Sequence, residues 1–246
     1  FQTVFFAIVV SVVCSCLITA SAVGLKDRQQ ANMALDKRIN LLKAADLIGE
    51  DRPPKNEINR LYDEHIDEVM VDNDGQVLDE HQKGTLKLYL IRQGEEIDGY
   101  ILPITSKGLW GKIQGYLAFE TDGQTVAGFS VFSHSETPGL GGEIESDWFQ
   151  KNFRGKKIVN AQNEFVSVGI AKGKVENLDE TDQANYVDGI SGATLTGKYL
   201  SEGIRDELAD AKPITIKFIQ RHLSPADPGD EPAGHEDNHH DEKGDE

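Results

Sequence analysis

The chain opens with an uninterrupted apolar run. Residues 1–25 contain no charged side chain and are rich in Val, Ile, Phe and Leu. A helix of 25 residues, rising about 1.5 Å per residue, exceeds a hydrocarbon core of roughly 30 Å, so the run predicts a transmembrane anchor at 1–25. The small-residue pattern Ala20-Ser21-Ala22 keeps a cleaved signal peptide open as the alternative.

Beyond the apolar run the hydrophobic spacing becomes helical. Lys26 and Arg28 come first; positive charge alone would place this side in the cytoplasm, and the sequence by itself leaves the orientation open. We predict a juxtamembrane helix and linker at 26–52, since prolines at 53 and 54 interrupt a helix. The apolar positions of this helix are Met33, Leu35, Ile39, Leu42 and Leu47. A second helix is expected after the prolines, with one face formed by Ile58, Leu61, Tyr62, Ile66 and Val69.

Alternation of apolar and polar residues then predicts strands separated by Gly- and Asp-bearing turns. The expected strands are Leu86–Leu90, Gly99–Thr105, Ile113–Glu120, Val126–Phe132, Phe165–Lys172 and Ile214–Ile219. Further helices are expected at Glu143–Phe153 and Thr194–Leu208. Together these elements predict an α+β domain with a mainly antiparallel sheet at 53–223, preceded by one transmembrane helix.

Charge and cysteine content narrow the functional classes. The chain carries 25 basic and 42 acidic side chains, a net charge of −17, which makes nucleic acid an unexpected partner. Cys14 and Cys16 both lie in the apolar run, which argues against a disulfide framework, a four-cysteine zinc site or an iron–sulfur cluster in the soluble part. Asp72-Asn73-Asp74-Gly75 resembles the start of a calcium loop, but no Glu follows at the required distance and a turn is expected. No metal site is therefore predicted.

The last 23 residues, 224–246, combine acids, histidines, Pro and Gly with no apolar residue larger than Ala. Such a segment cannot bury enough surface to offset its chain entropy, so a disordered acidic tail is expected. His235, His239 and His240 lie in it beside acids; a solvated tail is favoured over weak metal scavenging.

The stretch from Asp188 to Lys198 places glycines and hydroxyls directly before a predicted helix, where free N–H groups favour a phosphate. A P-loop is disfavoured because Tyr199 follows Gly192-x4-Gly197-Lys198, where Ser or Thr should hold magnesium. A nucleophilic serine at Ser191 is disfavoured too. The closing glycine of a nucleophile elbow is absent, and His134 is the only evident base.

Asp188-x-x-Ser191-Gly192-Ala193-Thr194 resembles the flavinylation motif of FMN-binding domains in which FMN is linked to the threonine by a phosphoester. A second stretch, 134–142 (HSETPGLGG), resembles the segment of the same domain that lines the isoalloxazine ring. The resemblance extends beyond the two motifs to the family of the C subunit of the sodium-translocating NADH:quinone reductase. The further segments that carry it are the apolar anchor, residues 22–26 with the helix that follows them, residues 108–111 and residues 143–149. The flavin subunit of Rnf complexes shares both flavin segments and resembles the N-terminal region less well; the segment after Leu223 resembles neither.

The resemblance implies a role for each motif residue. FMN would be attached to Thr194 and not to Thr196, which points from another face of the helix. Asp188 would serve attachment or order the turn, and Lys172 would either offset the cofactor charge or be a solvated surface lysine. Trp110 would stack on the flavin, with filling of the core as the alternative. The phosphate seat would be formed by Ser191, Gly192, Ala193, Leu195 and Thr196, and the ring contacts by Glu136, Thr137, Gly139 and Leu140.

The resemblance also implies a location and a function. The chain would be a single-pass protein of the bacterial inner membrane with a periplasmic domain. It would relay electrons from an iron–sulfur centre of integral membrane subunits to another flavin during sodium-pumping NADH:quinone oxidoreduction. Its partners would be the other membrane subunits, a flavin transferase for maturation, and membrane lipid. No catalytic acid–base residue and no NADH site are expected in this chain. The alternatives are an Rnf-type complex or a cofactor-free, membrane-anchored scaffold protein.

Overall fold

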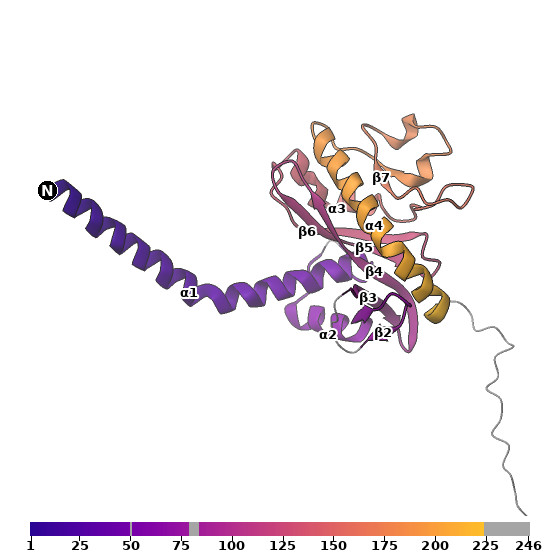
Figure 1. Cartoon of the computed structure of the whole chain (residues 1–246), viewed down its shortest axis with the longest axis horizontal. Helices are drawn as coiled ribbons and strands as arrows, with labels where there is room; N and C mark the ends of the chain where they lie inside the picture. Colours follow the sequence, from indigo (N-terminus) through magenta and orange to yellow (C-terminus); the bar gives the residue numbers. More distant parts are fainter. Residues whose placement is uncertain (50, 79–83, 224–246) are drawn as a thin grey trace, which may run out of the picture.

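A long N-terminal helix, α1 (Gln2–Ala44), projects from the rest of the molecule (Figure 1). The computed structural model describes residues 1–49, 51–78 and 84–223; the expected tail at 224–246 lies outside them. Residues 1–34 are exposed, and α1 is long and apolar enough to cross a membrane, a test that N-terminal signal sequences also pass. The helix is continuous through residue 25 and ends before the prolines, so Leu47 lies beyond it.

The last turns of α1 pack on the body of the protein. Ile39, Leu41 and Leu42 are buried in a cluster with Ile58 of α2 (Lys55–His65). A Cβ at Gly128 would lie 2.3 Å from the backbone oxygen of Ala44, so the helix end approaches the neighbouring strand closely. These contacts join the C-terminal turns of α1 to the folded domain.

The centre of the domain is a six-stranded, fully antiparallel sheet in the order β2-β1-β3-β4-β5-β6. The expected α+β class and its mainly antiparallel sheet are confirmed, and the four consecutive strands between residues 86 and 133 lie where alternation predicts them. The strands are β1 (Ile66–Val71), β2 (Val77–Leu78), β3 (Leu86–Gln93), β4 (Glu96–Lys107), β5 (Lys112–Glu120) and β6 (Val126–Ser133).

One helix boundary was wrong. Ile66 and Val69, expected on the second helix, belong to β1, because α2 ends at His65 and Ile66–Val71 pairs with β3. The turn at Asp72–Gly75 is confirmed, since the Asp72 carboxylate accepts hydrogen bonds from the backbone N–H of Asp74 (2.8 Å) and Gln76 (2.9 Å).

The two faces of the sheet have different covers (Figure 1). α1 and α2 cover the face that carries Ile101 and Tyr116. The long helix α4 (Thr194–His222) covers the other face, where Leu102 and Leu117 pack with it. Successive residues along a strand therefore point to opposite faces of the sheet and pack in two separate cores.

The strand expected at Ile214–Ile219 was wrong, because these residues are the last turns of α4 and Pro213 lies inside the helix. Thr215 and Phe218 are buried three residues apart, and the Phe218 ring meets Tyr100 with centroids 6.2 Å apart. Tertiary packing on the sheet therefore overrides the local β-branched preference.

The segment between β6 and α4 is mostly irregular. The helix expected at Glu143–Phe153 divides at Ser146, whose backbone is extended, into a 3₁₀ turn and a short helix. The strand expected at Phe165–Lys172 is reduced to two residues, since Ser167 has a φ of 70° and interrupts it. The elements are η1 (Gly141–Glu145), α3 (Asp147–Lys151), β7 (Gly169–Ile170), η2 (Val175–Asn177), η3 (Gln183–Asn185) and β8 (Tyr186–Val187), with β7 and β8 parallel.

Candidate functional site

The N-terminus of α4 is open to a ligand. Thr194 is its first residue, and Ala193 precedes it without a side-chain cap. The backbone N–H groups of Thr194, Leu195 and Thr196 have no acceptor among the residues that the structure describes, and no acid lies in the first turn. Unpaired N–H groups and the helix dipole together favour an anion at this position.

Thr194 and Thr196 differ sharply in environment. Thr194 is exposed, whereas Thr196 is 2% exposed. The Thr196 hydroxyl donates a 2.5 Å hydrogen bond to Oε2 of Glu136. Of the two threonine hydroxyls, only that of Thr194 is therefore accessible for a covalent bond.

The turn before α4 depends on small residues. Gly192 has a φ of 75°, in the left-handed region. A Cβ on Gly192 would also lie 2.8 Å from Cδ2 of Leu140. Ala193 is buried and Ser191 is exposed. The turn brings residues 191–194 against the 137–140 loop, as the two motifs would require for one shared site.

Glu136 connects three segments of the site. It is 4% exposed, and besides Thr196 its carboxylate accepts a 3.0 Å hydrogen bond from the Trp110 backbone N–H. A Cβ on Gly141 would lie 2.8 Å from Oε2 of Glu136, and one on Gly108 would lie 2.5 Å from Oε1. The glycines thus allow the carboxylate to be enclosed. The motif predicts only a ring contact for Glu136, and its bridging position was missed.

His134 holds the same loop from its other side. The Glu136 backbone N–H donates to Nδ1 of His134 at 3.1 Å, and Nε2 lies 3.1 Å from Oε2 of Glu145. Because Nδ1 accepts a hydrogen bond, it carries no proton, and Nε2–H donates to Glu145. Within the described chain, no hydrogen bond joins His134 to Ser191, so the geometry gives no support to a serine nucleophile.

An apolar cavity of about 220 Å³ adjoins Thr194. The exposed fraction of Trp110 is 68%, and Leu140 and Leu195 are also exposed. Exposed apolar side chains grouped around a hollow are typical of a ligand site. Gly139, with a φ of 74°, shapes the nearby turn without lining the cavity. The lining residues are Leu109, Trp110, Glu136, Thr137, Leu140, Gly141, Gly192, Ala193, Thr194, Leu195 and Thr196.

Asp188 and Lys172 lie apart from this cavity. The Asp188 carboxylate pairs with Lys174 at 2.6 Å and accepts a 2.8 Å hydrogen bond from the Val175 backbone N–H. The Lys174 ammonium and this N–H hold the pKa of Asp188 below its usual range. Lys172 is exposed and lines a second, larger cavity that Thr194 also borders. In the structure Asp188 therefore orders the 173–175 loop.

The motifs and the sequence around them recur in known proteins. The FMN-binding domain family matches residues 108–209, which include both motifs. The C subunit of the Na(+)-translocating NADH-quinone reductase from Vibrio campbellii is 32% identical over 223 residues, covering 76% of this chain and 82% of that protein. The protein of the same name from Pseudomonas aeruginosa is 32% identical over 229 residues, covering 80% and 87%.

Two solved structures share the fold. The C subunit of the same reductase from Parabacteroides distasonis has a TM-score of 0.66 and 28% identity, covering 79% of this chain and 96% of that one. NqrC from Shewanella oneidensis has a TM-score of 0.63 and 20% identity, covering 79% and 100%. Sequence, motifs and fold agree, and the chain belongs to the family of the C subunits of Na(+)-translocating NADH-quinone reductases.

Proposed function

We propose that this chain is an electron-carrying subunit of a membrane-bound, sodium-translocating NADH:quinone reductase and holds FMN covalently through a phosphoester on Thr194. The observation that carries the proposal is the exposed Thr194 hydroxyl at an uncapped helix N-terminus beside an apolar cavity. The relatives' names supply the complex. Their match over most of the chain favours this complex over the Rnf-type alternative.

The residues present fit such a group. The free N–H groups of the first turn of α4 would hold the phosphate, with Gly192 allowing close approach. Leu140, Leu195 and Trp110 would cover the flat apolar ring, and Thr137 would lie at its edge. When bound, the flavin would supply one-electron redox chemistry.

The remaining side chains act by positioning. Glu136 fixes the first turn of α4 to the loop that carries Trp110, through its two hydrogen bonds. Thr196 is the partner of Glu136 and would hold the helix start in place. Asp188 orders the neighbouring loop, and Lys172 would add positive charge near the phosphate. No acid–base step is assigned to any of them, since electron transfer needs a fixed, accessible carrier rather than a proton donor.

The place of this chain in the complex follows from the same proposal. α1 would anchor it in the bacterial inner membrane among lipid and the other membrane subunits, with the folded domain in the periplasm. The chain would receive electrons from an iron–sulfur centre of those subunits and pass them to another flavin on the way to quinone. A separate flavin transferase would form the bond to Thr194.

The direct test is the intact mass of the full chain after acid denaturation, with and without co-expressed flavin transferase. We expect a gain of one FMN that requires the transferase, is lost in Thr194→Val, and persists in the matched control Thr196→Val. Absence of any gain, with the transferase active on another substrate, would contradict the proposal and favour a cofactor-free scaffold protein.

A further inference from the structure

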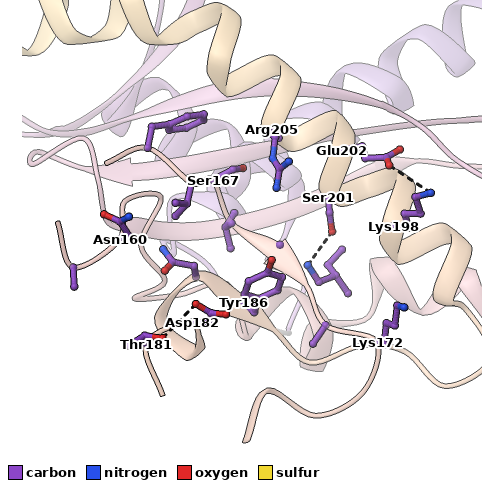
Figure 2. A pocket seen from close by; sticks show the side chains of 18 of the residues that line it. Asn160, Ser167, Lys172, Thr181, Asp182, Tyr186, Lys198, Ser201, Glu202 and Arg205 are labelled. Carbon is purple, nitrogen blue, oxygen red and sulfur yellow. Dashed lines mark hydrogen bonds and ion pairs between the residues drawn. The ribbon is translucent and has the colours of Figure 1, made fainter. Parts of the chain in front are cut away.

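A second cavity, of about 930 Å³, shares only Thr194 with the apolar cavity described above. One wall is a stripe of α4 formed by Thr194, Lys198, Ser201 and Arg205, which are spaced as one helix face requires. Figure 2 shows the last three of them along the helix. The opposite wall comes from residues 160–172 and 181–186. The cavity therefore lies between α4 and the irregular segment around β7 and β8.

A buried polar atom in this wall has no partner. Ser167 is 3% exposed, and its hydroxyl is the only buried side-chain N or O atom of the described residues without a hydrogen bond. Its backbone is firmly held, because the N–H groups of Val166 and Ser167 both donate to the Ile158 oxygen, at 2.9 and 3.0 Å. Buried hydroxyls are normally paired. The Ser167 hydroxyl is thus a polar group of the cavity wall that no described residue pairs.

Cations on the same cavity are also without partners. Arg205 and Lys172 make no ion pair or hydrogen bond with any residue that the structure describes. Lys198 reaches Glu202 only at 3.8 Å. Three cations and two carboxylates, Asp182 and Glu202, line the cavity, so the local charge is positive in a chain of net charge −17. A guanidinium presents paired donors that match a carboxylate or a phosphate.

Apolar and aromatic side chains form part of the remaining lining, beside the polar Asn160, Gln162, Thr181 and Asn185. Phe165, Val168 and Ile170 face the cavity, with the ring of Tyr186 beside them. Such a wall favours an organic body over a bare inorganic ion. Figure 2 shows Ser167, Tyr186 and Arg205 around one hollow.

We propose that this cavity is a second binding site, separate from the flavin site, for a small organic anion. Arg205 and the Ser167 hydroxyl would hold its phosphate or carboxylate group, and Phe165 and Ile170 would contact its apolar body. Although Thr194 and Lys172 border this cavity, the four residues proposed to contact the ligand are not among those proposed to hold FMN, so the test can be read whether or not the chain carries a flavin.

The test is isothermal titration of the full chain in a non-ionic detergent with three probes: phenyl phosphate, benzoate and inorganic phosphate. We expect one equivalent of phenyl phosphate or benzoate to bind, and the preferred probe identifies the head group. Arg205→Ala should weaken that binding at least about tenfold, as loss of a charged hydrogen bond does. Arg221→Ala is the matched control, since Arg221 is also exposed on α4 but lies outside the cavity.

Ser167→Ala separates a ligand contact from a structural role. We expect it to weaken binding of the probe about threefold or more while leaving the unfolding temperature of the ligand-free protein unchanged or raised, because the hydroxyl has no internal partner to lose. A lowered unfolding temperature with unchanged binding would show that the hydroxyl is structural and would contradict the proposal.

Three further outcomes would overturn it. Inorganic phosphate binding as tightly as phenyl phosphate would remove the role of the apolar wall, and absence of binding by all three probes would exclude the site. Loss of binding in FMN-loaded chain, with binding retained in Thr194→Val, would assign the cavity to the flavin. Equal binding in both would support a separate site; if FMN does not load, the three probes and the Arg205→Ala and Ser167→Ala variants still test the site on their own.

Discussion

Two cavities meet at Thr194, and they differ in whether the polar side chains that line them are hydrogen-bonded within the protein. In the smaller one the Glu136 carboxylate is enclosed and hydrogen-bonded to Thr196 and the Trp110 backbone, so the surface left to a ligand is mainly apolar apart from Thr194 and the start of α4. In the larger one the Ser167 hydroxyl and the Arg205 guanidinium have no partner within the described residues. The first is preorganised by internal bonds; the second keeps polar groups open. The contrast separates residues that position from residues that are free to bind.

Removing the central bond of the smaller cavity should have the largest effect. Glu136→Ala leaves the buried Thr196 hydroxyl and the partly buried Trp110 N–H unpaired. We expect the free energy of unfolding to fall by about 3 kcal/mol, with reduced FMN loading. Urea unfolding of the full chain in detergent, followed by tryptophan fluorescence, measures this. Glu145→Gln, at an exposed carboxylate, should cost far less; equal losses would contradict a bridging role for Glu136.

Crowding the same bond should have a somewhat smaller effect. A Cβ on Gly141 would lie 2.5 Å from the Thr196 hydroxyl oxygen, so Gly141→Ala should lower the free energy of unfolding by about 2 kcal/mol. Gly173→Ala is the control, because nothing lies within 4 Å of a Cβ there. If both variants unfold at the same urea concentration, the packing around Glu136 is looser than the structure indicates.

The two threonines should divide stability from attachment. Thr196→Val loses its bond to Glu136 and should lower the free energy of unfolding by about 1 kcal/mol, while FMN still attaches. Thr194→Val should leave unfolding of the unloaded chain unchanged, because its hydroxyl is exposed. Urea unfolding of both variants without transferase measures the difference. A loss of stability in Thr194→Val but not in Thr196→Val would contradict this division of roles.

The smallest effect is expected from pH. The pKa of Asp188 is lowered by its ion pair with Lys174 and by the Val175 N–H. A lowered folded-state pKa means that this stabilisation is present above the ordinary pKa, about 4, and is lost as pH falls through the folded-state value. Asp188→Asn should therefore flatten the loss of stability below about pH 4. Unfolding temperatures measured in steps from neutral to acid pH check this, with Asp179→Asn as the control variant. Parallel curves of unfolding temperature against pH for wild type and Asp188→Asn would contradict it.

The sequence predicted the sheet and the grouping of the motifs better than the roles inside them. Alternation marks β4 to β6 directly, and the glycines of both motifs lie where the site needs close approach. The Glu136–Thr196 bond spans 60 residues, so no local pattern reveals it. A single acid inside a glycine-rich, apolar-lined loop was the available signal.

The error at the C-terminal end has a similar lesson. The β-branched run at 214–219 favours a strand locally, yet buried positions continue along α4 at helical spacing: Ile204, Leu208, Ala211, Thr215 and Phe218. The helical spacing of these residues was present in the sequence, and it outweighs the local strand propensity of the six residues 214–219. The Ser167 backbone, which interrupts the expected strand before β7, is set by hydrogen bonds to Ile158 that sequence spacing does not show.

The central claim is that Thr194 is the attachment residue, and peptide mapping tests it most directly. Trypsin releases the peptide Val175–Lys198, which contains four candidate aliphatic hydroxyls: Thr181, Ser191, Thr194 and Thr196. Tandem mass spectrometry of full chain made with an active flavin transferase should place one FMN on Thr194 alone. FMN on any of the other three hydroxyls, or an unmodified peptide, would contradict the account.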